Sequence, residues 1–181
     1  MASINFTGSG KYLGVDIVES TPEHANWLQN NLRQTDLREC LIMGATPWRA
    51  LHLPLGIKGA VTYTVMDFDG NPAAMFGTVP LEESDESIAS VWMLGTYQLE
   101  KHFRILIRMT QPILEHFQQR YDILENVVPV DHLRTIRWLI HAGCLFASQP
   151  TIVNGYAVVR FVRCADHIEV SFEEDERPVS N

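Results

Sequence analysis

The side chains that could bind a metal or act as nucleophiles are few in this chain and far apart along it. His102 and His116 fall in one long helical run, about 21 Å apart at roughly 1.5 Å per residue, which is too far to share one metal ion. His141 and Cys144 are close neighbours, but the sequence offers no third or fourth ligand beside them. It contains no Gly-x-Ser-x-Gly elbow, no Walker loop and no His-Glu-x-x-His motif. We therefore expect no metal site and none of these reaction classes.

The charge of the chain argues against nucleic acid as a partner. With 14 Lys and Arg against 22 Asp and Glu, the formal net charge is -8, so the average surface repels a phosphate backbone. Arg104, Arg108, Arg134 and Arg137 fall in two neighbouring helical segments and could form a local basic patch. Arginines scattered in this way more often form a solvated helix face.

The cysteines and the hydropathy pattern predict a soluble protein made in a cytoplasm. Cys40, Cys144 and Cys164 are odd in number and form no CxxC pair, which argues against a disulfide framework and favours a reducing compartment. The first residues have neither the basic nor the apolar region of a signal peptide. No apolar stretch approaches the roughly 20 residues that span a bilayer.

Length and composition predict one folded domain. The 181 residues are 46% hydrophobic and 20% charged, which is enough apolar side chain for a sizeable core. The chain shows no internal repeat and no Pro/Gly/Ser linker that would divide it. We expect a single domain over residues 11–172, a flexible polar segment at residues 1–10, and a flexible acidic tail at residues 173–181.

The first half of the chain alternates between strand and helix patterns. Thr21, Pro22 and Glu23 combine a hydroxyl N-cap, a proline at the first helical position and an early acid, which is typical of a helix start. Asp69-Gly70 lies between two β-rich runs and predicts a hairpin. The predicted strands are residues 12–18, 60–68, 72–80 and 87–94; the predicted helices begin near residues 21 and 36, and a short helix with a loop fills residues 45–59.

The second half carries two long apolar helix faces. Residues 98–121 repeat apolar side chains at steps of three and four, and Pro112 predicts a kink or break within them. Asp131 is the expected N-cap of a helix over residues 133–142, with Gly143 as its left-handed C-cap. The remaining predicted elements are a strand at 125–130, a hairpin of 145–152 and 156–164 around Asn154-Gly155, and an edge strand at 168–172.

One unit of the sequence resembles a known fold. Residues 126–146, NVVPVDHLRTIRWLIHAGCLF, follow the pattern of the second half of the GNAT (N-acetyltransferase) fold. The resemblance implies an α/β (α+β) fold with a mixed, mostly antiparallel, twisted sheet and helices on both faces. A narrower likeness is to the internal virion protein A family of T7-like short-tailed phages, over roughly residues 85–163. It rests on Val91-Trp92, residues 101–107, Tyr121-Asp122 and residues 132–146.

The GNAT resemblance implies a place for acetyl-CoA. The strand at residues 87–94 would splay from the strand at 125–130, and the thioester would enter the gap between them. The diphosphate would rest on backbone N–H groups at the start of the following helix. The residues that match these cofactor contacts are Met93, Leu94, Gly95, Thr96, Gln98, Lys101 and His102.

The chain departs from the family pattern at several of these positions. The family's phosphate motif is Gln/Arg-x-x-Gly-x-Gly/Ala, whereas residues 95–102 keep one Gly and one Gln and add the carboxylate of Glu100. His132 stands where family members often carry Asn, and Leu139 stands where a Tyr general acid is usual. Glu86 is the only carboxylate near the usual general base. The catalytic candidates implied by the resemblance are therefore Glu86 and His132.

Three hypotheses of function follow. The first is a phage GNAT-fold protein without acetylation activity that serves virion assembly or binds a host protein, in the host cytoplasm or the virion. The second is a working acetyl-CoA-dependent N-acyltransferase that modifies an amine on a host protein or small molecule. The third is a regulatory domain that binds a small ligand, since a fold does not by itself decide function.

Overall fold

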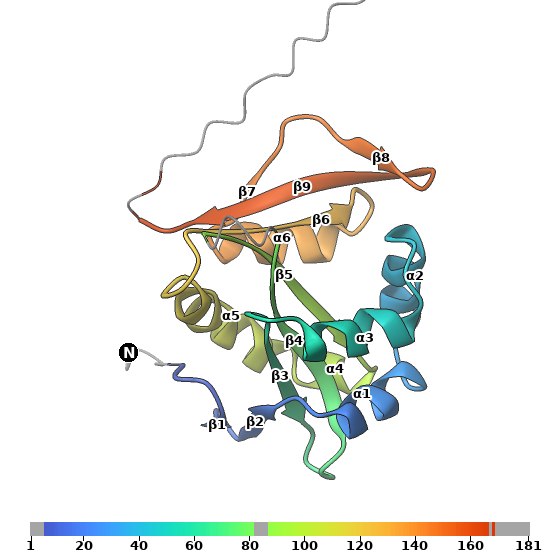
Figure 1. Ribbon diagram of the computed structural model, residues 1–181, viewed down its shortest axis with the longest axis vertical. Helices are drawn as coiled ribbons and strands as arrows, with labels where there is room; N and C mark the ends of the chain where they lie inside the picture. Colours follow the sequence, from blue (N-terminus) through green and yellow to red (C-terminus); the bar gives the residue numbers. More distant parts are fainter. Residues whose placement is uncertain (1–5, 82–86, 167, 169–181) are drawn as a thin grey trace, which may run out of the picture.

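The computed structural model describes residues 6–81, 87–166 and 168, and its centre is one open sheet (Figure 1). The strands lie in the order β1-β2-β3-β4-β5-β6-β9-β7, and β8 also pairs with β9. Among the described strands, β5 and β6 pair in parallel and every other pair is antiparallel. The strands are β1 Gly10–Tyr12, β2 Val15–Glu19, β3 Val61–Met66, β4 Pro72–Pro80, β5 Ile88–Gly95, β6 Ile123–Pro129, β7 Leu145–Phe146, β8 Thr151–Val153 and β9 Tyr156–Cys164.

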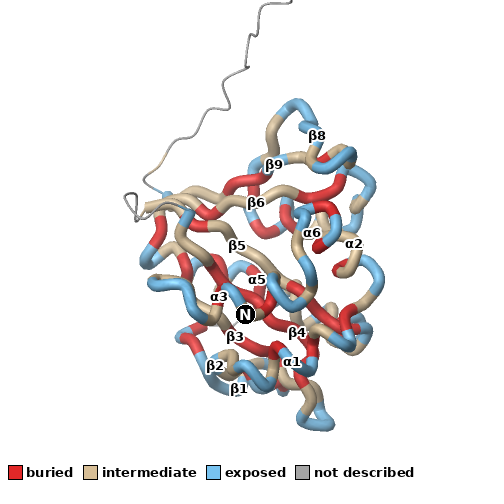
Figure 2. Tube along the Cα trace, turned by 45° about the vertical axis from the view of Figure 1, so that its right-hand side comes forward, coloured by how far each residue is buried: buried red, intermediate tan, exposed pale blue. Residues whose placement is uncertain are grey.

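Helices cover both faces of the sheet, which confirms the predicted fold class. One cluster of buried side chains joins α1, α2 and α3 to β4 and β5, and a second joins α5 and α6 to the opposite face. The strand between them, β4, is buried over its first seven residues (Figure 2). The helices are α1 Pro22–Gln29, α2 Gln34–Ile42, α3 Pro47–Gly56, α4 Gln98–Lys101, α5 Phe103–Phe117 and α6 Leu133–His141. No helix in the described part of the chain combines the length and the apolar character that a bilayer crossing requires.

The N-terminal region forms two strands, β1 and β2, where one strand over residues 12–18 was predicted. Residues 12–18 turn sharply between β1 and β2, because Leu13 and Gly14 both adopt positive φ angles, 51° and 94°. A pair of left-handed residues is the geometry of a tight hairpin turn. Residues 6–10, which we expected to be flexible, include Phe6, whose side chain is 2% exposed and packs edge-on against Tyr63. The predicted tail at 173–181 lies outside the described residues.

The first helix follows its sequence signals, and the second and third differ from their predictions in extent. The hydroxyl of Thr21 accepts a hydrogen bond from the His24 N–H, and the His24 ring accepts one from the Thr21 N–H, so α1 begins with a capping box. The second helix starts at Gln34, two residues before the expected Asp36. The third runs through Pro54 as one ten-residue helix rather than a shorter helix and a loop.

The long helical region breaks at His102, and at Pro112, where a kink or break was predicted, the helix is not broken. His102, with φ −99° and ψ 9°, ends α4 and precedes α5, whereas α5 continues through Pro112. The proline removes the bond to the carbonyl four residues earlier and crowds that carbonyl, here of Arg108, which lies on the exposed side of the helix. Asp131 is likewise not the N-cap of α6; that residue is His132, and the Asp131 carboxylate pairs with Arg38 at 2.8 Å instead.

Both glycine-containing hairpins are confirmed. Gly70 adopts a φ of 78° between β3 and β4, and Asn154 and Gly155 adopt φ angles of 48° and 82° between β8 and β9. The strand predicted over residues 145–152 is interrupted, since β7 and β8 are separated by residues 147–150. Gly143, with a φ of 84°, follows the end of α6 as predicted. Of the predicted edge strand at 168–172, only Ile168 is described.

Candidate functional site

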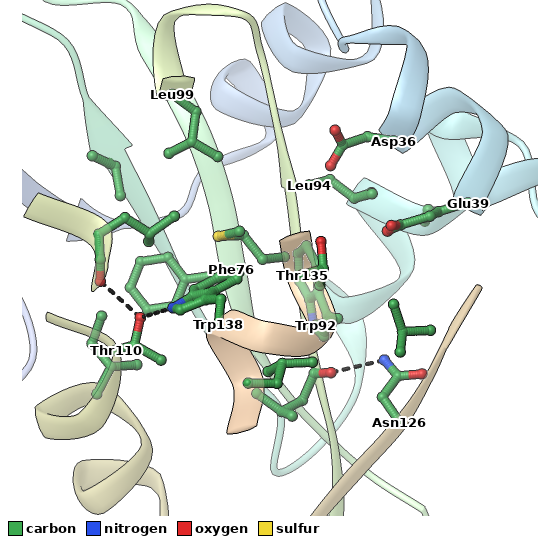
Figure 3. A pocket seen from close by; sticks show the side chains of 18 of the residues that line it. Asp36, Glu39, Phe76, Trp92, Leu94, Leu99, Thr110, Asn126, Thr135 and Trp138 are labelled. Carbon is green, nitrogen blue, oxygen red and sulfur yellow. Dashed lines mark hydrogen bonds between the residues drawn. The ribbon is translucent and has the colours of Figure 1, made fainter. Parts of the chain in front are cut away.

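The sheet opens where β5 and β6 diverge. The two strands pair only from Ile88 to Ser90 on β5. Immediately beyond, the Asn126 side chain donates a hydrogen bond to the Val91 carbonyl at 2.8 Å and accepts one from the Val127 N–H at 2.7 Å (Figure 3). The Asn126 side chain therefore bonds to the Val91 carbonyl and the Val127 N–H, the first peptide groups that would otherwise continue the β5–β6 pairing. It holds the two strands apart at a fork.

Asn126→Leu is expected to weaken this fork. An apolar side chain of similar size leaves the Val91 carbonyl and the Val127 N–H without partners, so we expect the free energy of unfolding to fall by about 1–2 kcal/mol. Urea denaturation measures this loss. Gln119→Leu, at an exposed position after the end of α5, is the control and is expected to change stability by less than about 0.5 kcal/mol. Equal stability of the two variants would contradict the role given to Asn126.

Alternate peptide groups of β5 point into the gap beyond the fork. In an antiparallel pair, every second residue bonds to the neighbouring strand and the residues between direct their groups to the other side. The Thr96 N–H donates to the Ala73 carbonyl on the β4 side at 2.8 Å. Counting back along β5 in steps of two, the peptide groups of Gly95, Met93 and Val91 face the gap.

Of these three residues, Met93 keeps its peptide groups available. Asn126 takes the Val91 carbonyl. The Gly95 N–H donates to Asp36 Oδ1 at 3.3 Å, and the Gly95 carbonyl accepts from the Arg33 N–H at 3.1 Å. Among the described residues, no such bond engages Met93 on its gap-facing side. Its N–H and carbonyl form a short extended edge that an amide-containing ligand can pair with.

A cavity of about 270 Å³ extends from this fork between the sheet and the helices. Most of its wall is aliphatic or aromatic, and its polar side chains come chiefly from α2, the fork and α6 (Figure 3). Concave, mainly apolar sites with a few placed polar groups are the usual form of a small-molecule site. The residues labelled in Figure 3 are Asp36, Glu39, Phe76, Trp92, Leu94, Leu99, Thr110, Asn126, Thr135 and Trp138.

Glu39 lines the cavity from α2 and lies beside His132, the N-cap residue of α6. His132 Nδ1 lies 2.9 Å from Glu39 Oε1, at ion-pair distance but without hydrogen-bond alignment. Burial, with a further contribution from the neighbouring Asp36 carboxylate, raises the pKa of Glu39 to about 7. Burial lowers the pKa of His132 from its ordinary value. Glu39 therefore gains and loses its proton near neutral pH, which is where a general base works best.

Asp36, although in the same wall, is a positioning group. It is 1% exposed and pairs with Arg33, and its oxygens also accept hydrogen bonds from the Thr35 hydroxyl and the Gly95 N–H. Its hydrogen-bonding capacity is therefore largely used. It fixes the end of β5 against α2 and raises the pKa of Glu39 through its negative charge.

The indole of Trp92 brings an unused donor to the cavity. Trp92 lines the wall, and its Nε1–H is buried without a hydrogen-bond partner among the described residues (Figure 3). Buried donors are normally paired, so an unpaired one in a cavity wall indicates where a polar atom of a ligand would be bound.

The sequence-predicted cofactor residues divide into two groups. Met93, Leu94 and His102 line the cavity, whereas Gly95, Thr96, Gln98 and Lys101 do not. A Cβ on Gly95 would lie 2.7 Å from Leu99 Cδ2, so this glycine serves the packing of α4 against β5. The Thr96 hydroxyl accepts from the Gln98 N–H at 3.1 Å, which occupies one amide at the start of α4. These contacts leave few free backbone N–H groups at the start of α4 to bind a diphosphate.

Positive charge gathers beside that helix start instead. The Arg134 guanidinium lies 3.9 Å from the centre of the Phe103 ring. Lys101 and Arg104, close to Phe103 in the sequence, are exposed. The Glu100 carboxylate, which we expected to face the diphosphate, is 4.0 Å from an Arg33 nitrogen. These side chains can attract an anionic group even though the glycine-rich cradle of the family motif is absent.

The α6 helix presents no tyrosine to the cavity. Leu139 is 8% exposed and belongs to the core on the α5 side, as expected for an apolar residue at this position. The Trp138 indole donates to the Thr110 hydroxyl at 2.8 Å, which ties α6 to α5. Thr135, one turn before Leu139, lines the cavity (Figure 3).

The thiols of Cys40 and Cys144 stay protonated near neutral pH. Burial raises the pKa of Cys40 and that of Cys144 to about 11 each. Among the described residues, no three His, Cys, Asp or Glu side chains gather closely enough to hold a metal ion.

Sequence reasoning named His132 but missed its partner. Glu39 follows Asp36 by three residues, a spacing that places both carboxylates on one helix face, so a signal existed. Nothing in the sequence indicates that this face meets His132, nor that Asn126 sits at the fork. Glu86, the other predicted catalytic residue, lies outside the described residues.

Comparison with solved structures gives the fold a name. The match to a GCN5-related N-acetyltransferase from Kribbella flavida has a TM-score of 0.63 at 12% identity and covers 83% of this chain and 98% of that chain. The match to spermidine N-acetyltransferase from Vibrio cholerae, solved with CoA and spermine, has a TM-score of 0.62 at 9% identity over 83% and 95%. This chain has the GNAT fold. The predicted fold resemblance is confirmed.

A third GNAT-fold structure that matches is aminoglycoside acetyltransferase AAC(6')-Ib in complex with ribostamycin and coenzyme A, with a TM-score of 0.61 at 14% identity over 83% and 93% of the two chains. By sequence, no family model and no curated protein matches this chain. No comparison supports the narrower likeness to internal virion protein A, which stays a prediction.

Proposed function

We propose that this protein is an acyl-CoA-dependent N-acyltransferase that acts on a cationic amine. The observation that carries the proposal is the fork between β5 and β6. Its free peptide edge at Met93 leads into a cavity lined by Glu39, which has His132 beside it. The likeness to GNAT-fold acetyltransferases supports the reaction class at the level of the fold.

The residues of the fork have separate tasks in this proposal. The Met93 peptide would pair with the amide-containing arm of CoA, and the Trp92 indole would donate to a polar atom of the bound reactants. Lys101, Arg104 and Arg134 would attract the phosphates. Acyl-CoA supplies the activated thioester carbon that an amine attacks.

Glu39 of α2 and His132 at the start of α6 carry out proton transfer in this proposal. Glu39 accepts one proton from the ammonium form of the substrate, directly or through His132, and leaves a nucleophilic amine. As the new C–N bond forms and the C–S bond breaks, the second proton of the amine passes to the departing sulfur. Leu139 is therefore not required to act as an acid. Thr135 can donate a hydrogen bond on this side of the cavity.

A cationic acceptor fits the charges of the site. The Glu39 carboxylate lies in the wall, the neighbouring Asp36 carboxylate is paired with Arg33, and the whole chain carries a formal charge of -8. Two structural neighbours were solved with cationic amines, spermine in one and ribostamycin in the other. Polyamines and aminoglycosides are therefore the first acceptors to test.

Thiol release tests the proposal. Purified protein is mixed with acyl-CoA and a panel of polyamines, aminoglycosides and lysine peptides, and free CoA and the acylated amine are both measured. The proposal predicts amine-dependent thiol release and an amide product of matching mass. Binding of acyl-CoA without any product over the whole panel would reject catalysis in favour of a ligand-binding role.

The rate should rise with pH through about 7. The base form of Glu39 is needed, and its pKa is raised to about 7, so kcat/KM is expected to be low near pH 5.5 and to approach a plateau above pH 8. A profile measured at saturating acyl-CoA with a primary amine of high pKa checks this. A flat profile between pH 5.5 and 8 would contradict the assignment of Glu39.

A second candidate rests on the crowded helix start. Leu99 fills the space beside Gly95, and the Thr96 hydroxyl occupies the Gln98 N–H, which favours a protein that does not bind the diphosphate tightly. On this hypothesis the GNAT fold serves as a binding scaffold for a virion or host protein. Absence of any thermal shift with millimolar acyl-CoA would support this candidate over the first.

A further inference from the structure

Part of the cavity wall is an apolar surface of α5, and we call the space beside it the apolar arm. Ile105, Met109, Ile113 and Phe117 recur at every fourth position and all line it. These residues span about 18 Å of helix at roughly 1.5 Å per residue. The sheet side of the arm includes Phe76 of β4. An acetyl group would occupy only the entrance of the apolar arm.

The arm offers no unpaired polar group to a ligand among the described residues that line it. Its polar side chain is Thr110, whose hydroxyl donates to the Leu106 carbonyl at 2.7 Å and accepts from the Trp138 indole at 2.8 Å. Cavities with such walls exclude water and bind apolar molecules. The arm is therefore suited to a linear hydrocarbon.

We propose that this arm receives the acyl chain of the donor, so that the preferred substrate is a medium-chain acyl-CoA rather than acetyl-CoA. The inference rests on the proposed function and specifies the acyl donor of that reaction. An acceptor amine has to reach Glu39, whose helix packs on the opposite face of the sheet from α5. The fork lies between the two faces. The Glu39 carboxylate is on one side of it and the apolar arm is on the other.

Titration calorimetry with CoA, acetyl-CoA and octanoyl-CoA tests the inference. Six further carbons buried in the arm should lower the Kd of octanoyl-CoA at least about 30-fold below that of acetyl-CoA. Equal Kd values for the two thioesters would overturn the inference and leave the proposed function standing. No binding of any of the three would instead reject the proposed function.

Filling the arm should remove the preference. Ile113→Phe adds bulk to the wall of the arm and is expected to raise the Kd of octanoyl-CoA about tenfold, with acetyl-CoA binding unchanged. Gln111→Phe places the same ring on the exposed side of α5 and should change neither value. Met109→Phe is the second filling variant if Ile113→Phe fails to fold. A folded filling variant that keeps the full preference for octanoyl-CoA would contradict the inference.

Discussion

Glu39→Gln is expected to lower kcat/KM for amine acylation by roughly 10²–10⁴-fold, the usual contribution of a positioned base. Glutamine keeps the shape of the side chain and cannot accept the proton. The Kd of acyl-CoA should be unchanged, because Met93 and the fork are untouched. The same substitution should abolish the rise of the rate through pH 7. Thiol-release assays across the pH range measure kcat/KM and its pH dependence, and calorimetry measures the Kd.

The stability of the Glu39→Gln variant separates lost chemistry from a lost fold. The pKa of Glu39 is raised from an ordinary 4.5 to about 7, so its contribution to stability is present at low pH and declines as the pH rises between these values. The variant lacks that decline and should be at least as stable as the wild type at pH 8. Glu115→Gln, on the exposed side of α5, is the matched control. Unchanged kcat/KM in Glu39→Gln would exclude Glu39 as the base.

Met93→Pro is expected to raise the Kd of acyl-CoA by about 10–100-fold. Proline removes the N–H that faces the gap, while the bonds from β5 to β4 are made by the residues on either side of Met93. Proline is tolerated in a strand only where its N–H would face away from the ladder. The folded state should therefore survive, with some loss of stability from the restricted backbone. Calorimetry gives the Kd, and far-UV circular dichroism checks the fold.

Met93→Leu is the control for the side chain at this position. Leucine keeps the N–H and most of the apolar surface, so the Kd should change less than about threefold. A loss of affinity in Met93→Leu as large as in Met93→Pro would mean that the side chain, and not the peptide edge, holds the ligand.

The fold could be predicted where local chemistry decides it. The Thr21-Pro22 helix start and the turns at Asp69-Gly70 and Asn154-Gly155 each depend on a few adjacent residues, and the structure contains all three. The turn at Leu13-Gly14 was missed because Leu rarely adopts a positive φ. The helix break was placed at Pro112 because proline is the strongest local signal, whereas the break at His102 has no such signal.

The site was less predictable because it is assembled from distant segments. His132 entered as a candidate through the family resemblance, while its contact with Glu39 depends on how α2 packs beside α6. Asn126 reads in the sequence as one polar residue within an apolar strand. Only the divergence of β5 from β6 shows that its amide separates the two strands.

Amide hydrogen exchange at Met93, followed by NMR with and without saturating acyl-CoA, tests most directly whether the fork is a thioester site. The ligand should pair with the gap-facing peptide, so exchange of the Met93 N–H should slow at least about tenfold, while that of Gly95, already bonded to Asp36, should change little. Unaltered exchange at Met93 with millimolar acyl-CoA present would contradict the account.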